Sequence, residues 1–256
     1  MFEESLEKIM DSLLGKKETK SELHTEDEIL EDICMKVGNG SELQMEKRIH
    51  DIIIKNVEYE DGGRKEDHEK SGPILTQKGV CDGISKLADT LFKMKGMESC
   101  LVYGVLCMGG EIQGPHAWNQ IRIDGAWYHI DITEDLAISD GRLPYRYDYF
   151  NLSDAEISQD HVIKQSEHQC VTSGRGYYEL NNLYVNNIRE FKQIMIDCLK
   201  KEGNLTVKLP RVKNPREMEE RLNKHVMEYC KTIYNKRFSI ESVMNPDQMV
   251  YSVRVV

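Results

Sequence analysis

Three residues of this sequence have side chains that could together form an activated nucleophile: a thiol, an imidazole and a carboxylate. They are Cys81, His116 and Asp131, in the segments GVCDGIS, HAWN and WYHID. A cysteine thiolate attacks carbonyl carbons, a neighbouring imidazole moves the proton, and a carboxylate orients the imidazole. These residue types therefore indicate covalent acyl chemistry.

The segment after Cys81 predicts a helix that begins at the cysteine. Its apolar residues have the three-and-four spacing of one helix face; they are Ile84, Leu87, Ala88, Leu91 and Phe92. Gly79 precedes the helix and Gly96 is placed to end it. Free backbone N–H groups at a helix start favour a thiolate. A small buried cysteine is the alternative when Cys81 is considered by itself.

A predicted β-hairpin brings the imidazole and the carboxylate together. Asp124-Gly125 is a strong two-residue turn signal between two apolar-alternating segments. In that register Trp118 lies opposite Asp131 and His116 opposite Thr133. His116 and Asp131 are then diagonal neighbours, about 7–8 Å apart at the backbone. His129, the rival base, lies further from the helix start.

These motifs resemble the core of the transglutaminase-like superfamily, whose members use a Cys-His-Asp triad on a papain-like fold. The resemblance runs from about residue 50 to His161 and includes YRYDYFNLS at 145–153. It implies that Cys81 is the nucleophile, His116 the base and Asp131 the orienting carboxylate. Two positions depart from the pattern: Ile84 replaces a usual aromatic residue, and Glu134 replaces a frequent tryptophan.

Other parts of a substrate site are expected nearby. The backbone N–H of Cys81 is a natural donor to an oxyanion, and Gln77 is the nearest upstream side chain that could be a second donor. Trp118 could line the acyl site, although core packing is an equal alternative. His161 matches a histidine common in relatives, but we favour a structural role for it. We expect no metal site and no cofactor, because the cysteines and acidic residues lack ligand spacing.

Composition limits the class of protein and its partners. A formal net charge of −10 argues against nucleic acid or an anionic membrane as the main partner, so a peptide or protein substrate is expected. Seven scattered cysteines indicate no disulfide framework. Without a signal peptide or a long apolar segment, the chain is predicted to be cytoplasmic. The oligomeric state is not indicated.

The chain is predicted to be an α+β protein in three parts. Residues 1–40 form an N-terminal helical segment, with helices at 2–14 and 25–37. Residues 41–176 form the catalytic core, in which N-terminal helices pack on an antiparallel sheet and 60–71 is an exposed loop. Residues 177–256 form an accessory βαβαβ module, with strands near 183–185, 205–209 and 249–256 and helices at 188–201 and 215–236.

The residues alone leave the reaction open. An amine acceptor would give transglutaminase-like cross-linking, and water would give a cysteine peptidase or amidase with the same triad. A catalytically silent peptide-binding protein is a third possibility. A thiol redox sensor is disfavoured, because no second cysteine lies near Cys81 in the sequence.

Overall fold

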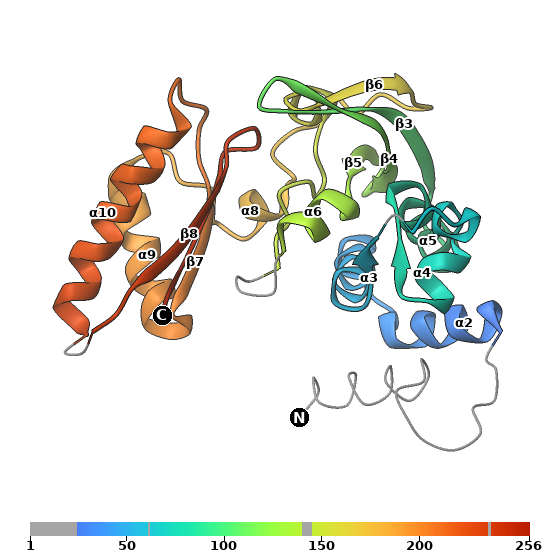
Figure 1. Ribbon diagram of the computed structural model, residues 1–256, viewed down its shortest axis with the longest axis horizontal. Coiled ribbons are helices and arrows are strands. Elements are labelled where there is room, and N and C mark those ends of the chain that lie inside the picture. The colour runs from blue at the N-terminus through green and yellow to red at the C-terminus, as the bar shows by residue number, and fades with distance from the viewer. Residues whose placement is uncertain (1–24, 61, 140–144, 235–236) are drawn as a thin grey trace, which may run out of the picture.

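The computed structural model describes residues 25–60, 62–139, 145–234 and 237–256. It is an α+β protein, as predicted, with a larger helix-and-sheet part and a smaller C-terminal part (Figure 1). The helix expected at 2–14 and the linker after it lie outside the described residues.

Three helices form one layer of the larger part: α2 (Glu26–Val37), α3 (Glu42–Asn56) and α5 (Cys81–Met94). The first two begin with capping boxes, in which Thr25 pairs with Glu28 and Ser41 with Gln44. Helix α5 begins at Cys81, as its apolar spacing predicted, and buries the face that carries Ile84 and Leu91. Apolar residues of α2 also pack in this core, and the predicted boundary at residue 40 stays a prediction.

The second layer is an antiparallel sheet in the order β5-β4-β3-β6. Its strands are β3 (Ser99–Met108), β4 (Glu111–Ile123), β5 (Ala126–Ile130) and β6 (His161–Gln165). The predicted hairpin is confirmed, because Ile123 pairs with Ala126 and the register continues to Asn119 and Ile130. Asp124 and Gly125 form its turn with positive φ angles of 50° and 83°.

The hairpin prediction required the strand pairing to continue to Asp131 and Thr133. In the structure the pairing ends at Ile130. Strand β5 ends at Ile130, and Asp131 is the N-cap of helix α6 (Ile132–Ile138). The Asp131 side chain accepts a hydrogen bond from the Glu134 backbone N–H. A short carboxylate side chain followed by Glu and Asp in the first turn favours a helix start, and this local effect ends the strand.

Short elements connect α3 to α5. Strands β1 (Glu58–Tyr59) and β2 (Lys78–Gly79) pair in parallel, and between them lie η1 (Lys65–His68) and α4 (Ser71–Leu75). The loop expected at 60–71 is not wholly exposed, because Asp67 is buried. A Cβ atom at Gly83 would lie 2.4 Å from the Asp67 carbonyl oxygen. Glycine at that position therefore lets the connection pack against the start of α5.

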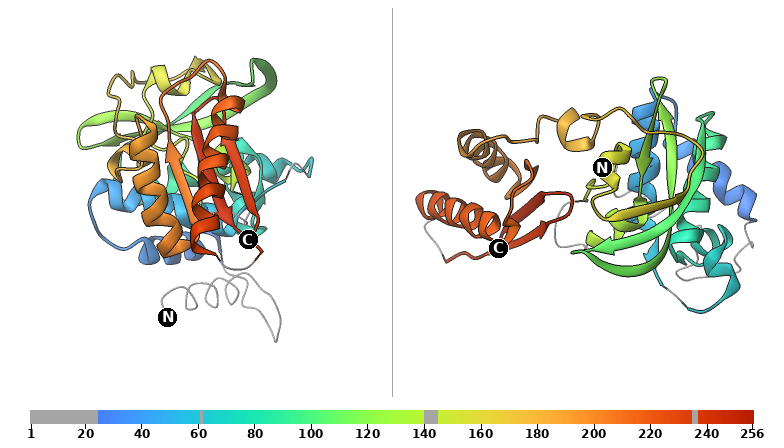
Figure 2. Two further views of the ribbon diagram at one scale, coloured as in Figure 1. Left: turned by 90° about the vertical axis from the view of Figure 1, so that its left-hand side faces the viewer. Right: turned by 90° about the horizontal axis from the view of Figure 1, so that it is seen from above.

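The C-terminal part has its own apolar core. It contains α9 (Ile188–Glu202), β7 (Asn204–Lys208), α10 (Pro215–Ile233), β8 (Ile240–Asn245) and β9 (Val250–Val255). The two helices cover one side of an antiparallel sheet in the order β7-β9-β8 (Figure 2). Strand β8 was not predicted, and the strand expected at 183–185 is reduced to a bridge between Tyr184 and Lys208. The boundary at 177 stays a prediction.

Two further short helices complete the larger part: α7 (Asp154–Ile157) precedes β6, and α8 (Tyr177–Leu180) lies between β6 and the C-terminal part. Tyr178 of α8 packs in the larger core. Buried polar contacts also join the two parts: Arg146 Nη2 donates to the Val250 carbonyl, and Asn245 Nδ2 donates to Asp148 Oδ2. No helix among the described residues is long and apolar enough to cross a membrane.

Candidate active site

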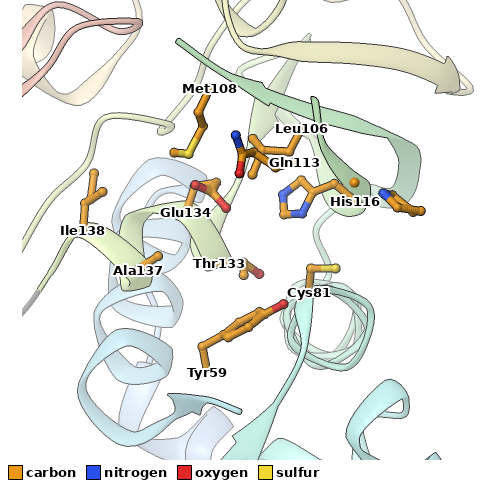
Figure 3. Close-up of a pocket in the computed structure, with 12 residues that line it drawn as sticks. Tyr59, Cys81, Leu106, Met108, Gln113, His116, Thr133, Glu134, Ala137 and Ile138 are labelled. Atoms are coloured by element: carbon orange, nitrogen blue, oxygen red, sulfur yellow. The ribbon is translucent and has the colours of Figure 1, made fainter. Parts of the chain in front are cut away.

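The start of α5 is tied to strand β4 by one serine. Ser85 Oγ lies 2.6 Å from the Cys81 carbonyl oxygen and 2.9 Å from that of Ala117. Asn119 Nδ2 donates to the Ser85 carbonyl at 3.0 Å. These bonds fix the first turn of the helix against the strand segment that carries His116. As a result, Cys81 and His116 face one another across the site (Figure 3).

His116 is held by Asp131, as the sequence predicted. Its Nε2 atom lies 2.5 Å from Asp131 Oδ2, which leaves Nδ1 as the ring nitrogen available to Cys81 across the site. Burial would lower the pKa of His116, but the charge and hydrogen bond of Asp131 raise it to about 11. Burial would raise the pKa of Asp131, and the facing imidazolium groups hold it below its usual range. The pair is therefore an imidazolium and a carboxylate at neutral pH.

A second imidazole binds the same carboxylate oxygen. His161 Nε2 lies 3.1 Å from Asp131 Oδ2, and His161 Nδ1 lies 2.6 Å from Asp160 Oδ1. Burial opposes protonation of this ring, yet the two carboxylates raise the pKa of His161 to about 9. The structural role predicted for His161 from the sequence does not include this link to Asp131. The adjacent Asp160-His161 pair at a strand start was the only signal for it in the sequence.

A cavity of about 420 Å³ opens beside the thiol and the imidazole. It is lined by residues from β1, β3, β4, α5 and α6 (Figure 3): Tyr59, Cys81, Leu106, Met108, Gln113, Gly114, Pro115, His116, Thr133, Glu134, Ala137 and Ile138. Thr133 Oγ1 is buried and has no hydrogen-bond partner within the described residues. Burial and the nearby charge of Asp131 raise the pKa of Glu134 to about 7. An unpartnered hydroxyl and a carboxyl group are thus among the polar groups of the cavity wall.

The other predicted site residues lie elsewhere. Trp118 is fully buried behind His116, and its Nε1 donates to His129 Nδ1 at 2.9 Å, so it packs in the core and does not line the cavity. Gln77 lines a different, apolar cavity between α2, α3 and α5. His129, the rival base, is bound to Asp154 through Nε2 at 2.8 Å, and burial lowers its pKa.

Three clusters among the described residues have His, Cys or carboxylate atoms close enough to hold a metal ion. One is His116, Asp131 and His161, whose ligand atoms already bind each other. In a second, His129, Asp154 and Cys170, both ring nitrogens of the histidine are occupied by hydrogen bonds. The third is Cys100, Glu167 and His168, where the His168 ring stacks on Trp127 at 3.7 Å.

Comparison with known proteins agrees with the motif resemblance. Residues 31–132 match the profile of the Transglutaminase-like superfamily. Among curated proteins, none matches this sequence. Strand β6, with His161, and the C-terminal part lie beyond the matched segment.

Solved structures with some likeness include a TGase, at 20% identity and a TM-score of 0.38, covering 52% of this chain and 38% of the other. A candidate cysteine protease from Cytophaga hutchinsonii gives 22% identity and a TM-score of 0.36, covering 49% and 42%. A candidate protease from Parabacteroides distasonis gives 10% identity and a TM-score of 0.29, covering 90% and 50%. The chain therefore spans half the length of these proteins or less.

Proposed function

We propose that this protein catalyses thiol-dependent acyl transfer on peptide or protein amides, because residues 31–132 match the core of the Transglutaminase-like superfamily. One observation carries the proposal: Cys81 at a helix start faces His116, whose other nitrogen is 2.5 Å from the buried carboxylate of Asp131. All three belong to the matched segment, and the thiol and imidazole line the same cavity.

In the first half of the reaction, the Cys81 thiolate attacks the carbonyl carbon of the amide. The carbonyl π electrons move to oxygen, and the backbone N–H of Cys81 at the start of α5 is a donor available to that oxyanion. His116, protonated because of its raised pKa, gives its Nδ1 proton to the leaving amine. The C–N bond breaks, and a thioester between the acyl group and Cys81 remains.

In the second half, an acceptor attacks the thioester carbon and loses its proton to His116. A primary amine forms a new amide, and water forms a carboxylic acid; in both cases the Cys81 thiolate leaves. Asp131 remains ionised throughout and holds the imidazolium in place. The cavity wall supplies Thr133 and Glu134 to bind substrate or acceptor, which is the specificity role that we propose for them.

Mass spectrometry of the acyl-enzyme tests this function. The protein is offered a library of glutamine-containing peptides and quenched in acid, where thioesters survive. We expect a mass increase on the peptide that contains Cys81, with release of ammonia or an amine. Adding a primary amine then distinguishes transfer from hydrolysis, because a transferase gives the amine adduct and a hydrolase gives only the acid.

Three variants serve as controls. Cys81→Ala and His116→Ala should each abolish the adduct while the far-UV circular dichroism stays unchanged. Cys107→Ala removes another partly buried thiol, on β3, and should leave the adduct intact. Full acylation of the His116→Ala protein would exclude the mechanism.

A further inference from the structure

The catalytic carboxylate is connected by hydrogen bonds to the C-terminal part of the chain. From His116 the bonds run to Asp131, to His161 and to Asp160. Gln248, in the turn between β8 and β9, then donates from Nε2 to both oxygens of Asp160, at 3.0 Å and 3.1 Å. Gln248 is only 4% exposed and the other members are almost fully buried, so water does not compete for these bonds.

The turn that carries Gln248 is itself fixed against the larger part. Asn245 Oδ1 accepts from the backbone N–H groups of Asp247 and Gln248, both at 3.1 Å, which closes a side-chain turn. Asn245 Nδ2 donates to Asp148 and to the Tyr149 hydroxyl oxygen, at 3.0 Å and 3.3 Å. Figure 2, seen from above, shows this hairpin tip directed toward the larger part. The backbone position of Gln248 is thus fixed by Asn245.

The charges along this row alternate: Asp160, His161, Asp131 and His116. His161 is held protonated by the carboxylates on either side of it, and His116 by Asp131. The His161 imidazolium donates from both ring nitrogens, so it aligns the two carboxylates that flank it. Gln248 is the neutral end of the row, because its amide binds Asp160 without adding charge. Apart from it, the side chains of the described residues that bind Asp160 are His161 and Tyr149, whose hydroxyl is 2.8 Å from Oδ2.

We propose that Gln248 is a positioning residue for the catalytic centre, and that the C-terminal module completes the active site by presenting it to Asp160. Gln248 fixes Asp160, Asp160 fixes the His161 ring, and His161 shares with His116 the oxygen of Asp131 that orients the base. The expected effect on catalysis rests on the proposed acyl transfer, whereas the positioning of the two histidine rings does not depend on it.

The test compares two variants of the whole chain. Gln248→Met keeps much of the side-chain length and removes both N–H donors; Gln193→Met makes the same change at an exposed glutamine of α9 in the same module. We expect kcat for the Gln248 variant to fall about tenfold with KM changed less than about twofold, as for loss of a group behind a catalytic residue. The Gln193 variant should match the parent protein.

A second measurement separates this inference from the proposed reaction. Histidine ring ¹⁵N shifts report the protonation and hydrogen bonds of His161 and His116 without any substrate. Gln248→Met should move the signals of both rings, and Gln193→Met neither. Unchanged ¹⁵N shifts of His116 in the Gln248 variant would overturn the inference. A decrease in kcat no larger than the fraction of unfolded protein explains would also overturn it. Absence of turnover in the parent protein would instead refute the proposed function alone.

Discussion

The buried carboxyl group of Glu134 should make the stability of this protein depend on pH. Glu134 is 6% exposed, and burial together with the charge of Asp131 raises its pKa from 4.5 to about 7. The folded protein therefore binds this proton more tightly than the unfolded chain. Its contribution to the free energy of unfolding is fully present below about pH 4.5 and is lost as the pH rises through about 7.

Glu134→Gln removes this titration with little change of volume. A pKa difference of about 2.5 units corresponds to about 3 kcal/mol, at 1.4 kcal/mol for each unit. The difference in unfolding free energy, variant minus parent, should thus grow by up to about 3 kcal/mol between about pH 4 and about pH 8, in favour of the variant at the higher pH. Any constant offset from the substitution itself cancels in this comparison.

Urea denaturation followed by tryptophan fluorescence measures the effect, since Trp118 is fully buried and Trp127 is partly buried. The titration is run in a reducing buffer at several pH values, with m-values compared to verify two-state unfolding. Glu31→Gln, at an exposed glutamate of α2, is the charge-matched control and should follow the parent curve. If the difference in unfolding free energy between Glu134→Gln and the parent is constant with pH, or increases toward acidic pH, the reasoning is refuted.

Three other substitutions have defined outcomes. Asp131→Asn turns an N–H group toward two imidazolium rings, so peptide turnover should fall about 1000-fold or more; turnover within tenfold of the parent would contradict this. Gly104→Ala places a Cβ 2.3 Å from the Val162 carbonyl oxygen, and urea denaturation should show a loss of at least about 2 kcal/mol. Trp118→Ala should cost about 3–5 kcal/mol in the same assay, and clearly more than the control Trp127→Ala, whose ring is partly exposed; equal costs would argue against a core role for Trp118.

The structural features that could be predicted from the sequence are those set by local residue patterns. The apolar spacing after Cys81 placed the start of α5, and Asp124-Gly125 placed the turn and register of the hairpin. Both are determined within a few residues along the chain. His116 and Asp131 could be expected to meet for that reason, although the contact is made from a helix cap and not from the predicted extension of the strand.

Contacts between segments that are far apart in the sequence could not be predicted. Trp118 is buried because the segment around Tyr149 and Ile157 covers its side of the sheet, and that cover follows only from the tertiary fold. Strand β6 pairs with β3 across a long intervening segment, and this pairing brings His161 to Asp131. Gln248 lies in a polar turn that has no periodic pattern to mark it. Its partner Asp160 is distant in the sequence, so residue spacing gives no signal.

The two oxygens of Asp131 serve different neighbours, one the start of a helix and the other a pair of rings. An inert version of this protein for capturing bound peptides should therefore be made at the partly exposed thiol, where a single atom is lost. Replacing the acid would alter both the contact with the two rings and the start of α6, which forms one side of the cavity. Capture with such a protein would then report the shape of the unaltered cavity.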